Sequence, residues 1–307
     1  MTSILLWVIP MVPYAALQLS AVPGPPLFTE GPPPPPLGPL HPPSTSGAPV
    51  CPDAGGPSSP LSSRAVREAS RNWPWRPLET PGWKILVADR VVVRGDASVD
   101  VLRTSAAYLE AFHGMLSASL GGDARDVVFS ARVFADPAAF RRYAAQRGAL
   151  NAESFYDPRT AELAVCHDPA RGPGWLQKTL SHEFTHAYMD RVWKITEPLW
   201  LCEGMAEYFS TFTVRDGRLV PGAVDRRSVL LLRLGEPLPL RRFLALGRDD
   251  MYGPSFPTHY AQAWALVHYL MTRGDGTVDL LLRGRELQDV DRLDQAWREY
   301  LGKMSDQ

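Results

Sequence analysis

Hydrophobic positions recur with two different periods along the chain, and the change falls near Gly174. Before this glycine, short runs rich in β-branched residues predict strands, and two stretches with helical spacing predict helices. The expected strands cover residues 83–87, 91–93, 127–134, 155–156 and 161–166, and the expected helices cover residues 99–117 and 137–146. After Gly174, helices are expected at about 175–191, 198–212, 224–234, 258–272 and 287–301, with a short hairpin at 213–220. This order predicts an α+β domain with a small N-terminal mixed sheet packed on a mainly helical C-terminal half.

The first 78 residues lack this patterning. Residues 4–19 are mostly apolar and uncharged, and they resemble the apolar core of a secretory signal that ends near Ser20 or Ala21. This stretch is too short for a stable membrane span, which needs about 20 apolar residues. The alternatives to a signal are an uncleaved N-terminal anchor, which would tether the protein, and a misassigned start of the sequence. Residues 22–60 contain 15 of the 30 prolines, so residues 22–78 are expected to form a disordered linker. The chain is thus expected to consist of a signal or apolar segment (1–21), a linker (22–78) and a folded domain (79–307). This order predicts an exported protein that is periplasmic, secreted or membrane-tethered.

Composition changes this picture little. Of the 307 residues, 45% are hydrophobic and 21% are charged, as in ordinary globular proteins. The net charge of −1 argues against a nucleic-acid partner, which usually requires a basic surface. Three cysteines make neither a disulfide framework nor a cysteine-based zinc site. Nothing in the sequence indicates the oligomeric state.

The strongest chemical signal is an H-E-x-x-H sequence, His182-Glu183-Phe184-Thr185-His186, within the helix expected at 175–191. Histidines at positions i and i+4 project from one face of a helix, so both imidazoles can reach one zinc ion. Glu183 adjoins the first histidine, where it can contact a water molecule on the metal without being a ligand. The alternative is a pair of surface histidines on an amphipathic helix.

The helix expected at 198–212 is apolar on almost every face apart from Glu203 and Glu207, one turn apart. A helix of this kind is normally buried, and a buried carboxylate is costly unless it is paired or bound to a metal. One glutamate can therefore ligate the zinc while the other hydrogen-bonds a ligating imidazole. The alternative is that both glutamates face solvent.

Two motifs of the chain resemble the gluzincin metallopeptidases: His182-Glu183-x-x-His186 and Trp200-Leu201-x-Glu203-Gly204-x-Ala206. The resemblance is closest to MA-like peptidase domains of exported bacterial proteins and extends over about residues 83–272. It implies a zincin-like fold with the zinc site in the cleft between sheet and helices. It also implies that Glu203 is the third zinc ligand and that Glu207 contacts a ligating imidazole. Cys202 stands where the family commonly has Asn; we expect a buried thiol there, and an inhibitory or alternative ligand is the alternative.

Three protein ligands leave a fourth position on zinc open for water, whose pKa the metal lowers. Glu183 would take the proton of this water and pass it to the leaving amine. The oxyanion then needs a further donor. Tyr260 and His259 are candidates because related enzymes place a Tyr or His at a comparable late helix, although the spacing of Tyr260 also fits ordinary core packing. Tyr156 is a third candidate, since its hairpin is expected to provide the edge strand for an extended substrate.

Together these features predict a zinc-dependent enzyme that hydrolyses peptide bonds in a peptide or protein substrate. Two alternatives stay open, a non-catalytic zinc-containing binding module and a zinc amidase that acts on cell-wall peptide. The presence of Glu183 favours an enzyme, because a purely structural zinc site needs no general base. The amidase differs from the peptidase only in the shape of the substrate pocket, which the sequence does not specify.

Overall fold

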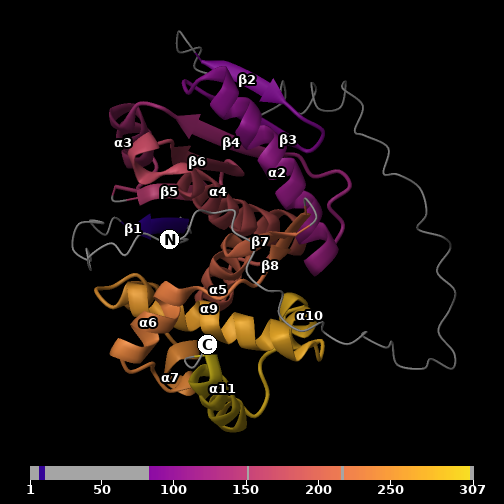
Figure 1. Ribbon diagram of the computed structural model, residues 1–307, viewed down its shortest axis with the longest axis vertical. Coiled ribbons are helices and arrows are strands. Elements are labelled where there is room, and N and C mark those ends of the chain that lie inside the picture. Colours follow the sequence, from indigo (N-terminus) through magenta and orange to yellow (C-terminus); the bar gives the residue numbers. More distant parts are fainter. Residues whose placement is uncertain (1–6, 11–82, 151, 216–217, 305–307) are drawn as a thin grey trace, which may run out of the picture. The chain divides into compact units, whose positions relative to one another are not determined.

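A computed structural model describes residues 7–10, 83–150, 152–215 and 218–304 (Figure 1). The expected signal at 1–21, apart from residues 7–10, and the expected linker at 22–78 lie outside the described residues. Among the residues described, no helix is long and apolar enough to cross a membrane.

The N-terminal part of the domain is a mixed β-sheet. Its strands are β2 (Lys84–Val87), β3 (Val91–Gly95), β4 (Phe129–Phe134), β5 (Ala152–Asp157) and β6 (Glu162–Cys166), in the spatial order β5-β6-β4-β3-β2. Strands β3, β4 and β6 are parallel, whereas β2 and β5 run antiparallel to their neighbours. The short strand β1 (Trp7–Pro10) pairs antiparallel with the other side of β5. The sequence-based expectation of a small mixed sheet is confirmed, but β5 is not the outermost strand once β1 is included.

Both faces of this sheet are covered by helices. Helix α2 (Val99–Leu120) begins at Ser98, whose side chain accepts the backbone N–H of Val101, and packs on β3. Helix α3 (Pro137–Ala145) packs on β4 and β6. Successive side chains of β5 point to opposite faces, so Phe155 joins the core under α3 while Tyr156 joins the core under α2 and α4.

The C-terminal part is mainly helical, as the spacing predicts. After the 3₁₀ turn η2 (Pro169–Arg171) come α4 (Pro173–Tyr188), the π-helical turn η3 (Met189–Trp193), α5 (Leu199–Ser210), the hairpin of β7 (Phe212–Arg215) and β8 (Arg218–Pro221), α6 (Arg226–Leu234), α7 (Leu240–Leu244), α8 (Arg248–Met251), α9 (Phe256–Arg273), α10 (Thr277–Leu282) and α11 (Val290–Met304). The five long helices and the hairpin confirm the expectations to within a few residues. The short helices α7, α8 and α10 were not expected.

Helix α4 connects the two parts. It packs on strands β5 and β6 and on α5, and α5 in turn packs along α9, as Figure 1 shows in the middle of the molecule. Gly204 allows this close approach, because a Cβ atom at this position would lie 2.6 Å from the carbonyl oxygen of Ala263. The neighbouring residue Glu203 is thereby brought against α9. Cys166 and Cys202 are both free thiols and buried.

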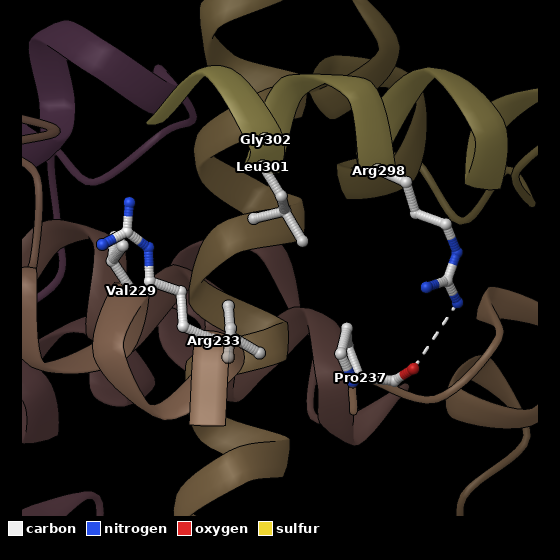
Figure 2. A pocket seen from close by; sticks show the side chains of 7 residues that line it. Val229, Arg233, Pro237, Arg298, Leu301 and Gly302 are labelled. Carbon is white, nitrogen blue, oxygen red and sulfur yellow. Dashed lines mark hydrogen bonds between the residues drawn. The ribbon is translucent and has the colours of Figure 1, made fainter. Parts of the chain in front are cut away.

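A surface pocket lies between α6 and α11. Figure 2 shows Arg233 and Arg298 near it, with an Arg298 guanidinium nitrogen donating to the carbonyl oxygen of Pro237 at 3.5 Å. The lining residues are Val229, Leu232, Arg233, Pro237, Arg298, Leu301 and Gly302. None of them carries the chemistry expected of the zinc motif.

Candidate metal centre

Helix α4 places the two histidines of the H-E-x-x-H sequence in the interior of the protein. His182 and His186 are each only 2% exposed, and Glu183 between them is fully buried. The two Nε2 atoms lie 3.0 Å apart, as expected for side chains one turn apart on the same face. The alternative of two surface histidines is therefore wrong.

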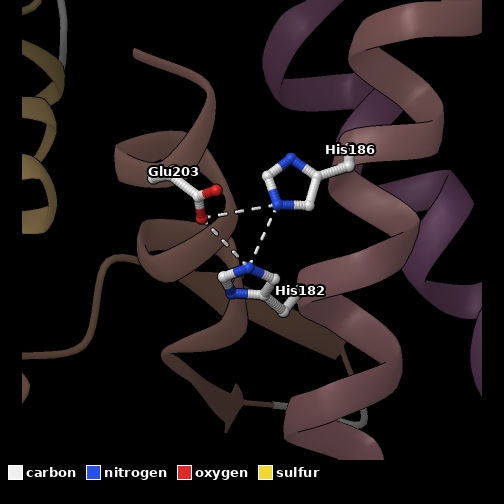
Figure 3. A group of neighbouring side chains, drawn as sticks. All are labelled: His182, His186 and Glu203. Atoms are coloured by element: carbon white, nitrogen blue, oxygen red, sulfur yellow. Dashed lines mark hydrogen bonds and ion pairs between the residues drawn. The ribbon is translucent and has the colours of Figure 1, made fainter. Parts of the chain in front are cut away.

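Helix α5 brings a carboxylate to the two imidazoles. Glu203 is fully buried, and the side chain of Glu207 is 15% exposed. Oε2 of Glu203 lies 3.3 Å from Nε2 of His182 and 3.5 Å from Nε2 of His186. In Figure 3 this oxygen points between the two rings. The alternative in which both glutamates face solvent is also wrong.

His182, His186 and Glu203 form a group that could hold a metal ion. Zinc bonds of about 2.0–2.1 Å in a tetrahedron require ligand atoms about 3.3 Å apart. The observed separations of 3.0, 3.3 and 3.5 Å match this requirement. Oε2 of Glu203 is buried without a well-formed hydrogen bond among the described residues. Its polar neighbours include the two Nε2 atoms, and a cation between these three atoms would compensate the buried negative charge.

Glu207 contacts the outer nitrogen of one imidazole. Its Oε1 atom lies 3.1 Å from Nδ1 of His182, and its Oε2 atom lies 3.8 Å from Nζ of Lys178. With Nδ1–H donated to Glu207, the Nε2 lone pair of His182 is turned toward the metal-ligating group. Burial alone would lower the pKa of His182, but hydrogen bonds to Glu203 and Glu207 raise it to about 10. A metal ion binds the unprotonated Nε2 of an imidazole, so metal binding at His182 requires the neutral ring.

Glu183 accepts a hydrogen bond from a residue of the sheet. The hydroxyl of Ser154 on β5 donates to Oε1 of Glu183 at 2.6 Å, and both residues are fully buried. Burial raises the pKa of Glu183 to about 8, although His182, Ser154 and the backbone N–H of Tyr156 act to lower it. A dication at the neighbouring ligands would favour the ionised form further.

Two tyrosines lie beside Glu203. Tyr252, directly after α8, donates its hydroxyl to Oε1 of Glu203 at 2.7 Å. The ring of Tyr260 on α9 is parallel to that of His182, with the centroids 6.2 Å apart. The Tyr260 hydroxyl is buried and has no well-formed hydrogen bond among the described residues. Burial and the charge of Glu203 raise the pKa of both tyrosines, so both hydroxyls stay protonated and act as donors.

Three other residues singled out from the sequence are buried but do not belong to the metal-ligating group. His259 precedes Tyr260 on α9 and is buried, but the contacts of the described residues do not bring it to the metal-ligating group. Tyr156 donates its hydroxyl to Oδ2 of Asp190 at 2.6 Å, so this donor is engaged away from the metal-ligating group. Cys202 is fully buried, and burial raises the pKa of its thiol well above the usual value. The expectation of a buried thiol at Cys202 is confirmed.

Sequence reasoning missed Ser154 and Tyr252. Ser154 lies two residues before Tyr156, so the alternation of β5 places both on the face that covers α4. The expected strand began at Phe155, one residue too late for this alternation to be noticed. Tyr252 follows a helix of only four residues, which carries no periodic signal.

Comparison with known families adds one finding. Residues 177–283 match the model of a family described as "Protein of unknown function (DUF1570)". This range contains the H-E-x-x-H sequence, Glu203, Tyr252 and Tyr260, and it excludes the whole mixed sheet of β1 to β6. The family's function is not characterised, so the match assigns no activity. Among the curated proteins, no sequence matches the chain.

The expected cleft around the zinc site stays a prediction. The ligand residues are buried, and the pocket of Figure 2 is lined by residues of α6, α11 and the segment before α7. What the described residues establish is a mixed α+β domain with a buried His-His-Glu group.

Proposed function

We propose that residues 79–307 form a zincin-like domain that hydrolyses peptide bonds, with zinc held by His182, His186 and Glu203 and with Glu183 as general base. The observation that carries this proposal is the convergence of the three ligand atoms at the separations required for tetrahedral zinc, with a buried carboxylate on the residue next to His182. The substrate class, a peptide or protein, follows from the gluzincin resemblance.

The donor set supports zinc over other metals. Two imidazole nitrogens and one carboxylate oxygen are the ligands of catalytic zinc in several hydrolases, whereas structural sites are typically closed by four ligands rich in cysteine. When bound, zinc polarises a carbonyl group and lowers the pKa of a water molecule. The buried thiol of Cys202 is not part of the metal-ligating group found among the described residues.

The protein's own residues would divide the remaining work. Glu183 accepts the proton of the attacking water and donates it to the leaving amine. Tyr260, whose buried hydroxyl lies beside Glu203, donates this hydroxyl to the carbonyl oxygen as negative charge develops there. Glu207 holds the ring of His182 in the tautomer that exposes its Nε2 lone pair. Tyr252 fixes the Oε1 side of Glu203 so that Oε2 faces the two imidazoles.

Removal of the metal tests the proposal directly. The full-length protein should contain one zinc ion per chain and should hydrolyse casein. A chelator should abolish hydrolysis, and stoichiometric zinc should restore it, since three ligands from folded helices re-form the site. Elemental analysis and the release of peptide fragments measure the two quantities side by side. A purified protein that contains no zinc and takes up none would refute the proposal.

One observation favours the second candidate function, a zinc-containing module that binds a partner without catalysis. All three ligand residues and Glu183 are at most 2% exposed, which resembles a structural site more than an open catalytic one. Zinc at one ion per chain without hydrolysis of casein or of a mixed peptide library would support this module. Hydrolysis of cell-wall peptide alone would instead identify the amidase.

The two tyrosines should have separable effects. Tyr260→Phe should lower kcat about 10²–10³-fold with the metal retained, because it removes a donor to the developing oxyanion. Tyr252→Phe should weaken zinc binding about 10–100-fold, because it removes a hydrogen bond that orients a ligand. Competition with a chromogenic chelator measures affinity, and steady-state kinetics at saturating zinc measures kcat. Loss of zinc in Tyr260→Phe together with normal affinity in Tyr252→Phe would reverse the assignment.

A further inference from the structure

Strand β5 makes a buried polar contact with the helix that carries the H-E-x-x-H sequence. The Ser154 hydroxyl donates to Oε1 of Glu183 at 2.6 Å, across 29 residues of sequence. Ser154 is fully buried, as is Glu183. A short hydrogen bond to a carboxylate in such an environment is stronger than one at the surface, because water does not compete for either partner.

The other carboxyl oxygen of Glu183 differs from Oε1 in its hydrogen bonding. Oε2 is buried and has no hydrogen-bond partner among the described residues. The Ser154 hydroxyl therefore distinguishes the two oxygens, since it donates to Oε1 and no side chain of the described residues donates to Oε2. Strand β5 is a firm support, because it pairs with β6 on one side and its Phe155 packs in the core under α3.

We propose that Ser154 is a positioning residue for Glu183: it anchors one carboxylate oxygen to strand β5 and so presents the other oxygen for proton transfer. This inference rests on the proposed function, in which Glu183 is the general base. Ser154 touches neither the substrate nor the reacting atoms in this role. It acts by restricting rotation of the Glu183 carboxylate.

The expected kinetic effect follows from the loss of this restriction. Without the hydroxyl, the carboxylate can rotate away from the position that proton transfer requires, and a displacement of about 1 Å can cost about 10²-fold in rate. Ser154→Ala should therefore lower kcat about 10–100-fold. Neither KM nor the zinc content should change, because Ser154 contacts no metal ligand and the substrate is bound by other groups.

Ser130→Ala is the matched control. Ser130 is also a buried serine of the same sheet, 2% exposed on β4, and its hydroxyl donates to a buried glutamate, Glu162, at 3.4 Å. A merely structural role of a buried Ser–Glu contact should affect both variants alike. We expect Ser130→Ala to lower the melting temperature and to leave kcat unchanged, whereas Ser154→Ala lowers both.

A second measurement tests the hydrogen bond between Ser154 and Glu183 without relying on catalysis. In the chelator-treated protein, the urea midpoint is compared for wild type, Ser154→Ala, Glu183→Leu and the double variant. Ser154→Ala should lower the midpoint when Glu183 is present, because the buried carboxyl group of Glu183 loses its donor. In the Glu183→Leu background it should have no effect or raise the midpoint, because it removes an unpaired hydroxyl from an apolar site.

The outcomes separate the two proposals. A fall in kcat for Ser154→Ala but not Ser130→Ala, together with coupling in the urea series, supports the positioning role. Equal kcat values for the two variants overturn it, and so does additivity of the Ser154 and Glu183 substitutions in the metal-free protein. A wild type that hydrolyses no peptide overturns the proposed function itself, which the urea series does not test.

Discussion

Glu203→Ala should empty the metal centre. The substitution removes one of three ligand atoms and leaves two imidazoles 3.0 Å apart without a carboxylate between them. Loss of a residue that only orients a ligand typically costs about 10–100-fold in metal affinity, so loss of the ligand itself should cost more than about 10²-fold. Elemental analysis after dialysis against a weak chelator should find about one zinc per chain in the wild type and almost none in the variant.

Two further variants calibrate this result. Glu207→Gln keeps the size of the side chain but weakens the contact to Nδ1 of His182, so its zinc affinity should lie between those of wild type and Glu203→Ala. Glu286→Ala removes an exposed glutamate far along the chain and should retain the metal. Circular dichroism of the metal-free proteins shows whether each variant is folded. A folded Glu203→Ala protein that keeps one zinc at wild-type affinity would contradict the ligand assignment.

The long elements of this fold could be predicted because their periodicity is unbroken over many residues. Helix α9, with 18 residues, repeats its apolar face often enough for the spacing to be recognised. Helices α7, α8 and α10 contain only four to six residues each, so fewer than two turns are available to show a period. Their boundaries are set by packing on α9 and α11 and by the turns that precede them, which local spacing does not encode.

The metal-ligating group could be predicted for a related reason. His182 and His186 lie one turn apart on one helix, and Glu203 and Glu207 lie one turn apart on another, so helix geometry relates each pair. The contacts that complete the site join separate segments. Tyr252 reaches Glu203 across 49 residues and depends on how α8 packs between α5 and α9. No periodic pattern in the sequence indicates that Tyr252 and Glu203 lie close together.

Resemblance to gluzincins named the roles of Glu203 and Glu207 but could not show how the groups around them are supported. In the sheet, Ser154 of β5 donates a hydrogen bond to Glu183. In the helical half, Tyr252 donates a hydrogen bond to Glu203. The base and the third ligand are thus supported by different parts of the domain. Because Glu183 shares helix α4 with His182 and His186, a displacement of one part relative to the other would change the contact of Glu183 with β5 and the position of Glu203 relative to the two imidazoles. The match at residues 177–283 covers only the part that carries the ligands.

Glu183→Gln should abolish hydrolysis and keep the metal. The amide has nearly the same shape and still accepts the Ser154 hydroxyl, but it does not take up a proton, so kcat should fall about 10²–10⁴-fold. Zinc content should stay at one per chain, since Glu183 is outside the ligand group. Glu153→Gln is the control. Glu153 lies on β5 next to Ser154 and forms an ion pair with Arg171, so the variant protein should hydrolyse casein at the wild-type rate. Hydrolysis by Glu183→Gln at the wild-type rate would exclude the general-base role, and loss of zinc would make Glu183 a support of the metal centre instead.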